Sequence, residues 1–121
     1  MRHIDINEYE QLIENLYYKI YNEEKIYIYG VPKNGCIVAA SLSAYAGIEI
    51  VDKPERAHII VDDLIDSGNT KKRYSKYNKE FVTLVEKTSS EWISFWFEKE
   101  VKEEDKDLIL RLAQRLEVDL K

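Results

Sequence analysis

The sequence predicts an α/β domain in which a twisted parallel sheet is flanked by helices on both faces. Short strand-like segments alternate with helical segments along the whole chain. Several of the strand-like segments are apolar at consecutive positions, as is typical of strands that are buried on both faces. The connections between the segments are short, which favours a layered α/β architecture. With 121 residues, the chain suits a single domain, 1–121, around one core.

The first elements are a helix and a strand. Residues 8–21 place apolar side chains at helical spacing. Asp5 and Glu8 form a candidate capping box at the start of this helix. Residues 25–30, KIYIYG, then predict a strand that ends at Gly30.

A turn and a second helix follow this strand. Residues 31–35, VPKNG, combine the Pro, Asn and Gly that are typical of turns. Residues 36–47 are small and apolar nearly all round, which predicts a buried helix that Gly47 ends. Cys36 is the single cysteine of the chain, and its apolar neighbours predict a buried thiol. One cysteine excludes an intrachain disulfide and a cysteine metal cluster.

The second half of the chain continues the alternation of strands and helices. Its final helix is amphipathic, with leucine and isoleucine at helical spacing. In the aromatic segment WISFWF, either the two tryptophans or the residues that alternate with them point inward. The predicted parts are a strand at 48–52, a connection at 52–57, strands at 58–63, 80–87 and 91–97, a short basic helix at 70–78, and the closing helix at 103–118.

Charge and hydropathy limit the classes of partner. The net charge is −5, so no global attraction to nucleic acid or to an anionic membrane is expected. The start of the chain lacks an apolar signal region, and no apolar run reaches the roughly 18 residues that span a bilayer. We therefore expect a cytoplasmic protein without a membrane partner. The basic residues between 71 and 79 predict a solvated helix face rather than an RNA-binding surface.

The stretch HIIVDDLIDSGNT, residues 58–70, indicates a binding site. Asp62 and Asp63 follow an apolar strand directly, so we expect both to leave the sheet and face a polar ligand. Neighbouring carboxylates suit sugar hydroxyls and a divalent cation. The following DSGNT loop, 66–70, precedes a helix and offers backbone N–H groups and hydroxyls to a phosphate. Such a site suits a ribose 5-phosphate; the alternative is a solvated loop that only caps the helix.

Three polar turns follow strand ends of the predicted sheet. They are Val31–Gly35, Asp62–Thr70 and Lys87–Trp92. Ligands of open parallel sheets bind beyond the carboxyl ends of the strands. We therefore expect the three turns to converge on one site.

These motifs resemble those of a known family. IIVDDLIDSGNT resembles the phosphoribosyl-pyrophosphate (PRPP) signature of the type I phosphoribosyltransferases. YIYGVPKNGCIVAASLSAYAGI is similar to the pyrophosphate loop and helix of that family, and FVTLVEKTSSEWISFWFE to the lysine strand and tryptophan tail of its bacterial xanthine-guanine members. The resemblance covers roughly residues 25–98, which we expect to form the core of the domain.

The resemblance implies roles for individual residues. Asp62 and Asp63 would hold the ribose hydroxyls and Mg²⁺, and Asp66 would be the general base. The other implied PRPP-binding residues are Lys33, Asn34 and Gly35 at the pyrophosphate, and Ser67, Gly68, Asn69 and Thr70 at the 5-phosphate. On the side of the base, Lys87 would hydrogen-bond a purine 6-oxo group, Trp92 would stack on the ring, and Ile93 would complete the pocket.

The resemblance also implies an activity, the Mg²⁺-dependent transfer of a 5-phosphoribosyl group from PRPP to a 6-oxopurine in purine salvage, by a homo-oligomer. The alternative is a non-catalytic regulatory protein that binds PRPP or a nucleotide. Two departures bear on this choice. Lys33-Asn34 stands where relatives commonly have Arg-Gly, and residues 52–57 replace a long loop that closes over PRPP. We expect a compromised lid, with the site covered by a partner subunit or by the C-terminal helix.

Overall fold

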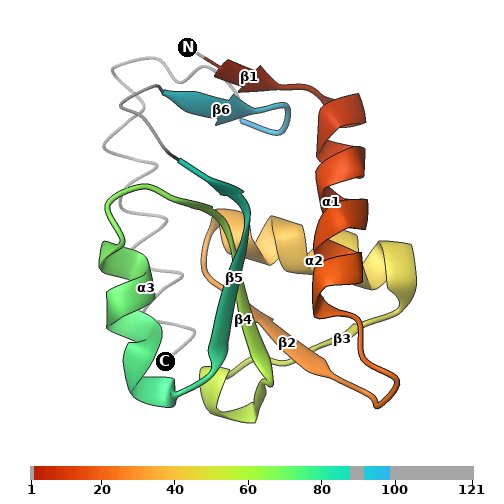
Figure 1. Ribbon diagram of the computed structural model, residues 1–121, viewed down its shortest axis with the longest axis vertical. Helices are drawn as coiled ribbons and strands as arrows, with labels where there is room; N and C mark the ends of the chain where they lie inside the picture. Colours follow the sequence, from red (N-terminus) through yellow and green to blue (C-terminus); the bar gives the residue numbers. More distant parts are fainter. Residues whose placement is uncertain (1, 88–91, 99–121) are drawn as a thin grey trace.

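The computed structural model describes residues 2–87 and 92–98, and a four-stranded parallel sheet forms its centre (Figure 1). All three strand pairs of this sheet are parallel, so the predicted parallel sheet is confirmed. In spatial order the strands are β3 (Glu49–Ile50), β2 (Tyr27–Gly30), β4 (Ile59–Ile65) and β5 (Glu80–Glu86).

Helices α1 (Ile6–Ile20) and α2 (Asn34–Ala46) cover one face of the sheet (Figure 1). The predicted start of α1 is confirmed, because the Asp5 carboxylate accepts a hydrogen bond from the Glu8 backbone N–H at 2.8 Å. The Glu8 carboxylate pairs with Arg2 at 2.8 Å. The apolar stripe of α1 and one side of α2 bury strand residues such as Val61 in the larger of two core clusters.

The predicted C-terminal end of α2 is confirmed, but the prediction that the helix is buried nearly all round is wrong. Gly47 adopts a left-handed φ of 71° and ends the helix, as expected. The helix lies on the outside of the layer, so only one side of it meets the sheet, and Tyr45 is 50% exposed. The predicted burial of Cys36 is also wrong: this residue is exposed, with its Sγ 3.4 Å from the Gly30 carbonyl.

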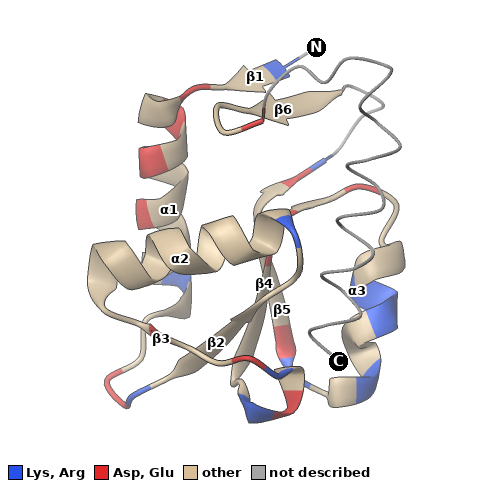
Figure 2. Cartoon of the chain, turned by 180° about the vertical axis from the view of Figure 1, so that it is seen from behind, with Lys and Arg blue, Asp and Glu red and all other residues tan. Residues whose placement is uncertain are grey.

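The opposite face of the sheet has a thinner cover. Helix α3 (Asn69–Tyr74) and the 3-10 turn η2 (Ser75–Tyr77) place Tyr74 and Tyr77 against a small cluster around Ile60. The lysine and arginine residues of α3 are exposed, and Figure 2 marks their positions in blue along the helix. The basic segment is therefore a solvated helix face whose aromatic residues belong to the core.

A second, two-stranded parallel sheet joins the ends of the described chain. It pairs β1 (Arg2–Ile4) with β6 (Ile93–Phe95), and Ile4 and Phe95 are both fully buried. Of the two alternatives for the aromatic segment, the residues between the tryptophans point inward, with Phe95 buried and Trp92 67% exposed. Strand β1 was not predicted, and the predicted helix at 103–118 lies outside the described residues.

The described ranges hold no helix with the length and apolar character that crossing a bilayer requires.

Candidate active site

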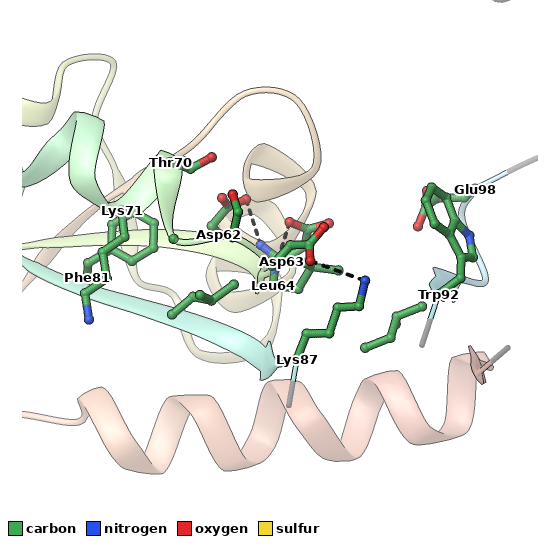
Figure 3. A pocket seen from close by; sticks show the side chains of 14 residues that line it. Asp62, Asp63, Leu64, Thr70, Lys71, Phe81, Lys87, Trp92 and Glu98 are labelled. Atoms are coloured by element: carbon green, nitrogen blue, oxygen red, sulfur yellow. Dashed lines mark hydrogen bonds and ion pairs between the residues drawn. The ribbon is translucent and has the colours of Figure 1, made fainter. Parts of the chain in front are cut away.

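A pocket of about 270 Å³ lies where the carboxyl half of β4 meets the end of β5 (Figure 3). Two of the three predicted turns contribute to it, and the Asp62–Thr70 segment forms most of its wall. The lining residues are Asp62–Gly68, Thr70, Lys71, Phe81, Lys87, Trp92, Ile93 and Glu98.

The acidic pair sits inside β4 and not beyond it. The prediction that both aspartates leave the sheet is wrong, because β4 runs on to Ile65 and Asp62 pairs in register with Thr83 of β5. Successive side chains of a strand point to opposite faces, so the two carboxylates leave the backbone in different directions. Asp62 is 7% exposed and Asp63 is half-buried.

Hydrogen bonds hold the two carboxylates in place. The Asp63 backbone N–H donates to Asp62 Oδ1 at 2.8 Å, and the Leu64 N–H donates to Asp63 Oδ1 at 2.8 Å. Burial, followed by hydrogen bonding and repulsion from Asp63, raises the pKa of Asp62 to about 8. Near neutral pH the pair therefore retains a proton in most molecules.

The predicted pyrophosphate turn adjoins this pair. The Asn34 side-chain amide donates to Asp63 Oδ2 at 3.0 Å, which ties the start of α2 to the end of β4. Gly35 is buried, and a Cβ added there would lie 2.7 Å from the Val61 carbonyl oxygen, so the site requires glycine. Lys33 is exposed and does not line the pocket.

The loop after β4 forms one end of the pocket. Ser67, Gly68 and Thr70 line it, whereas Asn69 is exposed outside it. Gly68 has a φ of 82°, a left-handed conformation that side chains other than glycine rarely adopt. The Ser67 hydroxyl accepts a hydrogen bond from the Asn69 N–H at 3.4 Å, so the loop closes on itself as a short turn.

Lys87 and the aromatic tail form the other end. Lys87 Nζ lies 3.3 Å from Asp66 Oδ1, and the Lys87 N–H continues the sheet by donating to the Ile65 carbonyl at 3.0 Å. The lysine side chain is 13% exposed and the Asp66 side chain 66%. Trp92 and the half-buried Ile93 line the pocket beside them. The structure thus pairs two predicted site residues, Asp66 and Lys87, that the sequence offered separately.

Sequence reasoning missed Phe81 and Glu98, which both line the pocket. A turn fixes Glu98: its N–H donates to the Phe95 carbonyl at 2.9 Å, and its Oε1 accepts from the Phe95 N–H at 3.0 Å. No local pattern marks this glutamate, because its place at the pocket depends on the pairing of β6 with the distant strand β1.

The acidic pair is compatible with the predicted Mg²⁺. Among residues 2–87 and 92–98, no group of three or more His, Cys, Asp or Glu side chains is arranged to hold a metal. Mg²⁺ is commonly bound by one or two carboxylates together with substrate phosphates and water. Asp63 therefore fits a cation that arrives with a phosphorylated substrate, and Asp62 fits it once the cation displaces the Asp62 proton.

Comparisons with known proteins identify the fold. No protein-family model matches the chain, and no curated protein matches it. The structure is similar to the crystal structure of purine phosphoribosyltransferase from Pyrococcus horikoshii Ot3, with a TM-score of 0.59 and 20% sequence identity over 84% of this chain and 98% of that chain. The chain has the phosphoribosyltransferase fold.

Within this phosphoribosyltransferase fold, the β3–β4 connection is a compact turn. It contains the 3-10 turn η1 (Pro54–Arg56), and Pro54 and Ala57 are buried. Ala57 packs in the same small core cluster as Ile60 of β4. None of the residues that line the pocket comes from this connection.

The buried acid should make folding stability depend on pH. The folded protein keeps the Asp62 proton up to about pH 8, while the unfolded chain releases it near the ordinary pKa of 3.8. A raised folded pKa means that this group's contribution to stability falls as the pH rises through that window. The Asp62→Asn side chain cannot ionise. The melting temperature of this variant minus that of wild type should therefore increase by roughly 3 °C or more from pH 5 to pH 8.

Thermal melts of both proteins across that range measure this difference. Asp52→Asn, which changes an exposed carboxylate paired with Arg56, is the control. A gap between Asp62→Asn and wild type that stays constant with pH would contradict the expected ionisation.

Proposed function

We propose that this protein transfers the 5-phosphoribosyl group of PRPP to a 6-oxopurine base and releases pyrophosphate. The main observation in support is the order of the side chains along one pocket. Thr70 lies at one end, the acidic pair lies in the middle, and Lys87 and Trp92 lie at the other end (Figure 3). A phosphate, a ribose and a base are joined in the same order in a nucleotide.

The loop and the acidic pair suit the phosphoribosyl half. Ser67 and Thr70 offer hydroxyl donors, and Gly68 presents backbone without a side chain. Asp62 and Asp63 would accept hydrogen bonds from the ribose hydroxyls. As pyrophosphate leaves, positive charge develops on the sugar, and nearby carboxylates stabilise it.

The acidic pair would also hold Mg²⁺ together with oxygens of PRPP. When bound, the cation neutralises negative charge that builds on the leaving pyrophosphate. Asn34 and Gly35 adjoin the acidic pair, so we propose that their turn binds the same leaving pyrophosphate. Lys33 is exposed at the start of α2, and its positive charge would attract the pyrophosphate from the solvent side of this turn.

Lys87, Asp66 and Trp92 suit the base. The lysine ammonium can only donate hydrogen bonds, so it favours a 6-oxo acceptor over the 6-amino donor of adenine. Asp66 lies 3.3 Å from it and would take the proton that the imidazole ring of the purine loses. The exposed Trp92 indole and the neighbouring Ile93 provide an apolar surface for the ring.

One observation favours a second function, a non-catalytic protein that binds PRPP or a nucleotide. The compact β3–β4 connection supplies no lining residue, whereas closure over the substrate excludes water during transfer. For the enzyme, we propose that a second subunit covers the site in a homo-oligomer. A monomer that transfers the phosphoribosyl group efficiently and does not hydrolyse PRPP would contradict the proposed cover by a second subunit.

Pyrophosphate release is the deciding measurement. The protein is incubated with PRPP, Mg²⁺ and one base at a time from guanine, xanthine, hypoxanthine, adenine, uracil and orotate. The enzyme should release pyrophosphate with the 6-oxopurines. PRPP binding without release for any base would favour the regulatory function.

Lys87→Ala should reduce the preference for 6-oxopurines over adenine. Loss of a hydrogen bond from a charged donor corresponds to roughly 10- to 100-fold in the ratio of their kcat/KM values. Trp92→Ala should weaken all purines alike, because stacking accepts any planar base. The control is Lys25→Ala, at an exposed lysine paired with Glu49. Unchanged selectivity in Lys87→Ala would remove the lysine from base recognition.

A further inference from the structure

We propose that Asn34 is a positioning residue that holds the Asp63 carboxylate in the orientation in which it binds the ribose and its cation. The inference rests on the proposed function and adds a residue to it. Asn34 was expected to face the pyrophosphate through the turn. Its side chain also reaches the acidic pair, so the turn and the pair form one hydrogen-bonded unit.

The geometry fixes Asp63 from two sides. The Asn34 amide donates to Oδ2 at 3.0 Å, and the Leu64 N–H donates to Oδ1 at 2.8 Å. Each carboxylate oxygen can accept more than one hydrogen bond, so both remain able to bind a hydroxyl or a cation. Without Asn34, Oδ2 would lose this hydrogen bond, and the carboxylate could rotate more freely about its side-chain bonds.

Two glycines bring the asparagine within reach. A Cβ at Gly30 would lie 2.5 Å from the Gly35 carbonyl oxygen, and a Cβ at Gly35 would lie 2.7 Å from the Val61 carbonyl oxygen. Both distances are far below contact, so only glycine allows the start of α2 to pack against the end of β2 and the middle of β4. With α2 held there, Asn34 lies beside Asp63 in the carboxyl half of β4.

The chemistry of the amide suits this role. An amide donates a hydrogen bond without adding a charge, so it orients a carboxylate and leaves its negative charge available to the ligand. A lysine or arginine at the same place would neutralise Asp63 and compete with a cation. An aspartate would repel it.

Binding of Mg²⁺-PRPP, measured by calorimetry, tests the inference. Asn34→Ala should weaken binding by roughly 10- to 100-fold, the range for losing a hydrogen bond to a charged group. Asn34→Asp should bind more weakly still. Melting temperatures of both variants, measured alongside, separate an effect on binding from a loss of stability.

A double-mutant cycle shows whether Asn34 acts through Asp63. In the Asp63→Asn background, adding Asn34→Ala should change PRPP affinity by less than about twofold, because the carboxylate to be positioned is gone. Asn15→Ala, at an exposed asparagine of α1 whose side chain contacts Gln11, is the matched control and should bind PRPP as wild type does.

Each outcome discriminates. Three results would overturn the positioning role alone. They are an unchanged PRPP affinity in Asn34→Ala, an affinity that follows melting temperature across the variants, and an equal loss of affinity in the wild-type and Asp63→Asn backgrounds. A wild-type protein that binds no PRPP would overturn the proposed function itself.

Discussion

Asp66→Asn should lower turnover by roughly a hundredfold or more, the usual size of a general-base contribution, while PRPP affinity stays near wild type. The amide cannot accept the proton of the purine imidazole. It also replaces the charged partner of Lys87, whose ammonium lies 3.3 Å from Asp66 Oδ1. Single-turnover rates with guanine and calorimetric PRPP affinities separate the two effects.

Asp52→Asn is the control for this substitution. Asp52 is an exposed carboxylate that pairs with Arg56 in the β3–β4 connection, away from the pocket lining. Its replacement should leave turnover unchanged. An Asp66→Asn protein as active as wild type would remove the general-base role from Asp66.

Gly68→Val should abolish measurable PRPP binding. The φ of 82° at Gly68 is a conformation that a β-branched residue rarely adopts, so the loop must change its backbone path to accept valine. Among residues 2–87 and 92–98, no atom lies within 4 Å of an added Cβ, so backbone strain rather than a steric clash is the expected cause. The Ser67 and Thr70 hydroxyls would lose their arrangement around the 5-phosphate.

Gly47→Val is the matched control for the strain. Gly47 also has a left-handed φ, 71°, with open space around an added Cβ, but it ends α2 away from the pocket lining. Both variants should lose comparable thermal stability, and only Gly68→Val should lose PRPP affinity. Equal PRPP affinity in the two folded variants would contradict the phosphate-binding role of the loop.

Local patterns were sufficient for most elements of the described chain. The spacing of apolar residues predicted α1, and Asp5 marked its start because an unpaired helical N–H needs an acceptor. Gly47 marked the end of α2 because left-handed backbone favours glycine. Consecutive apolar residues predicted the parallel strands. These features depend on interactions within a few residues, which a sequence displays directly.

The chemical state of the site needed the tertiary structure. Asp62 was expected beyond the strand, yet β5 runs alongside it and extends β4 through both aspartates. Burial by these distant neighbours raises the pKa of Asp62. The Lys87–Asp66 pair, the Asn34–Asp63 hydrogen bond and the approach of Glu98 likewise join segments far apart in the sequence.

The sequence by itself therefore determined the order of elements and the residue types at the ends of the strands. Tertiary structure decided which of those residues meet, which are buried, and which hold a proton. The physical reason is that desolvation and charge–charge interactions depend on distances in space. Parallel strands bring the ends of separate segments to one edge of the sheet, where such distances become short.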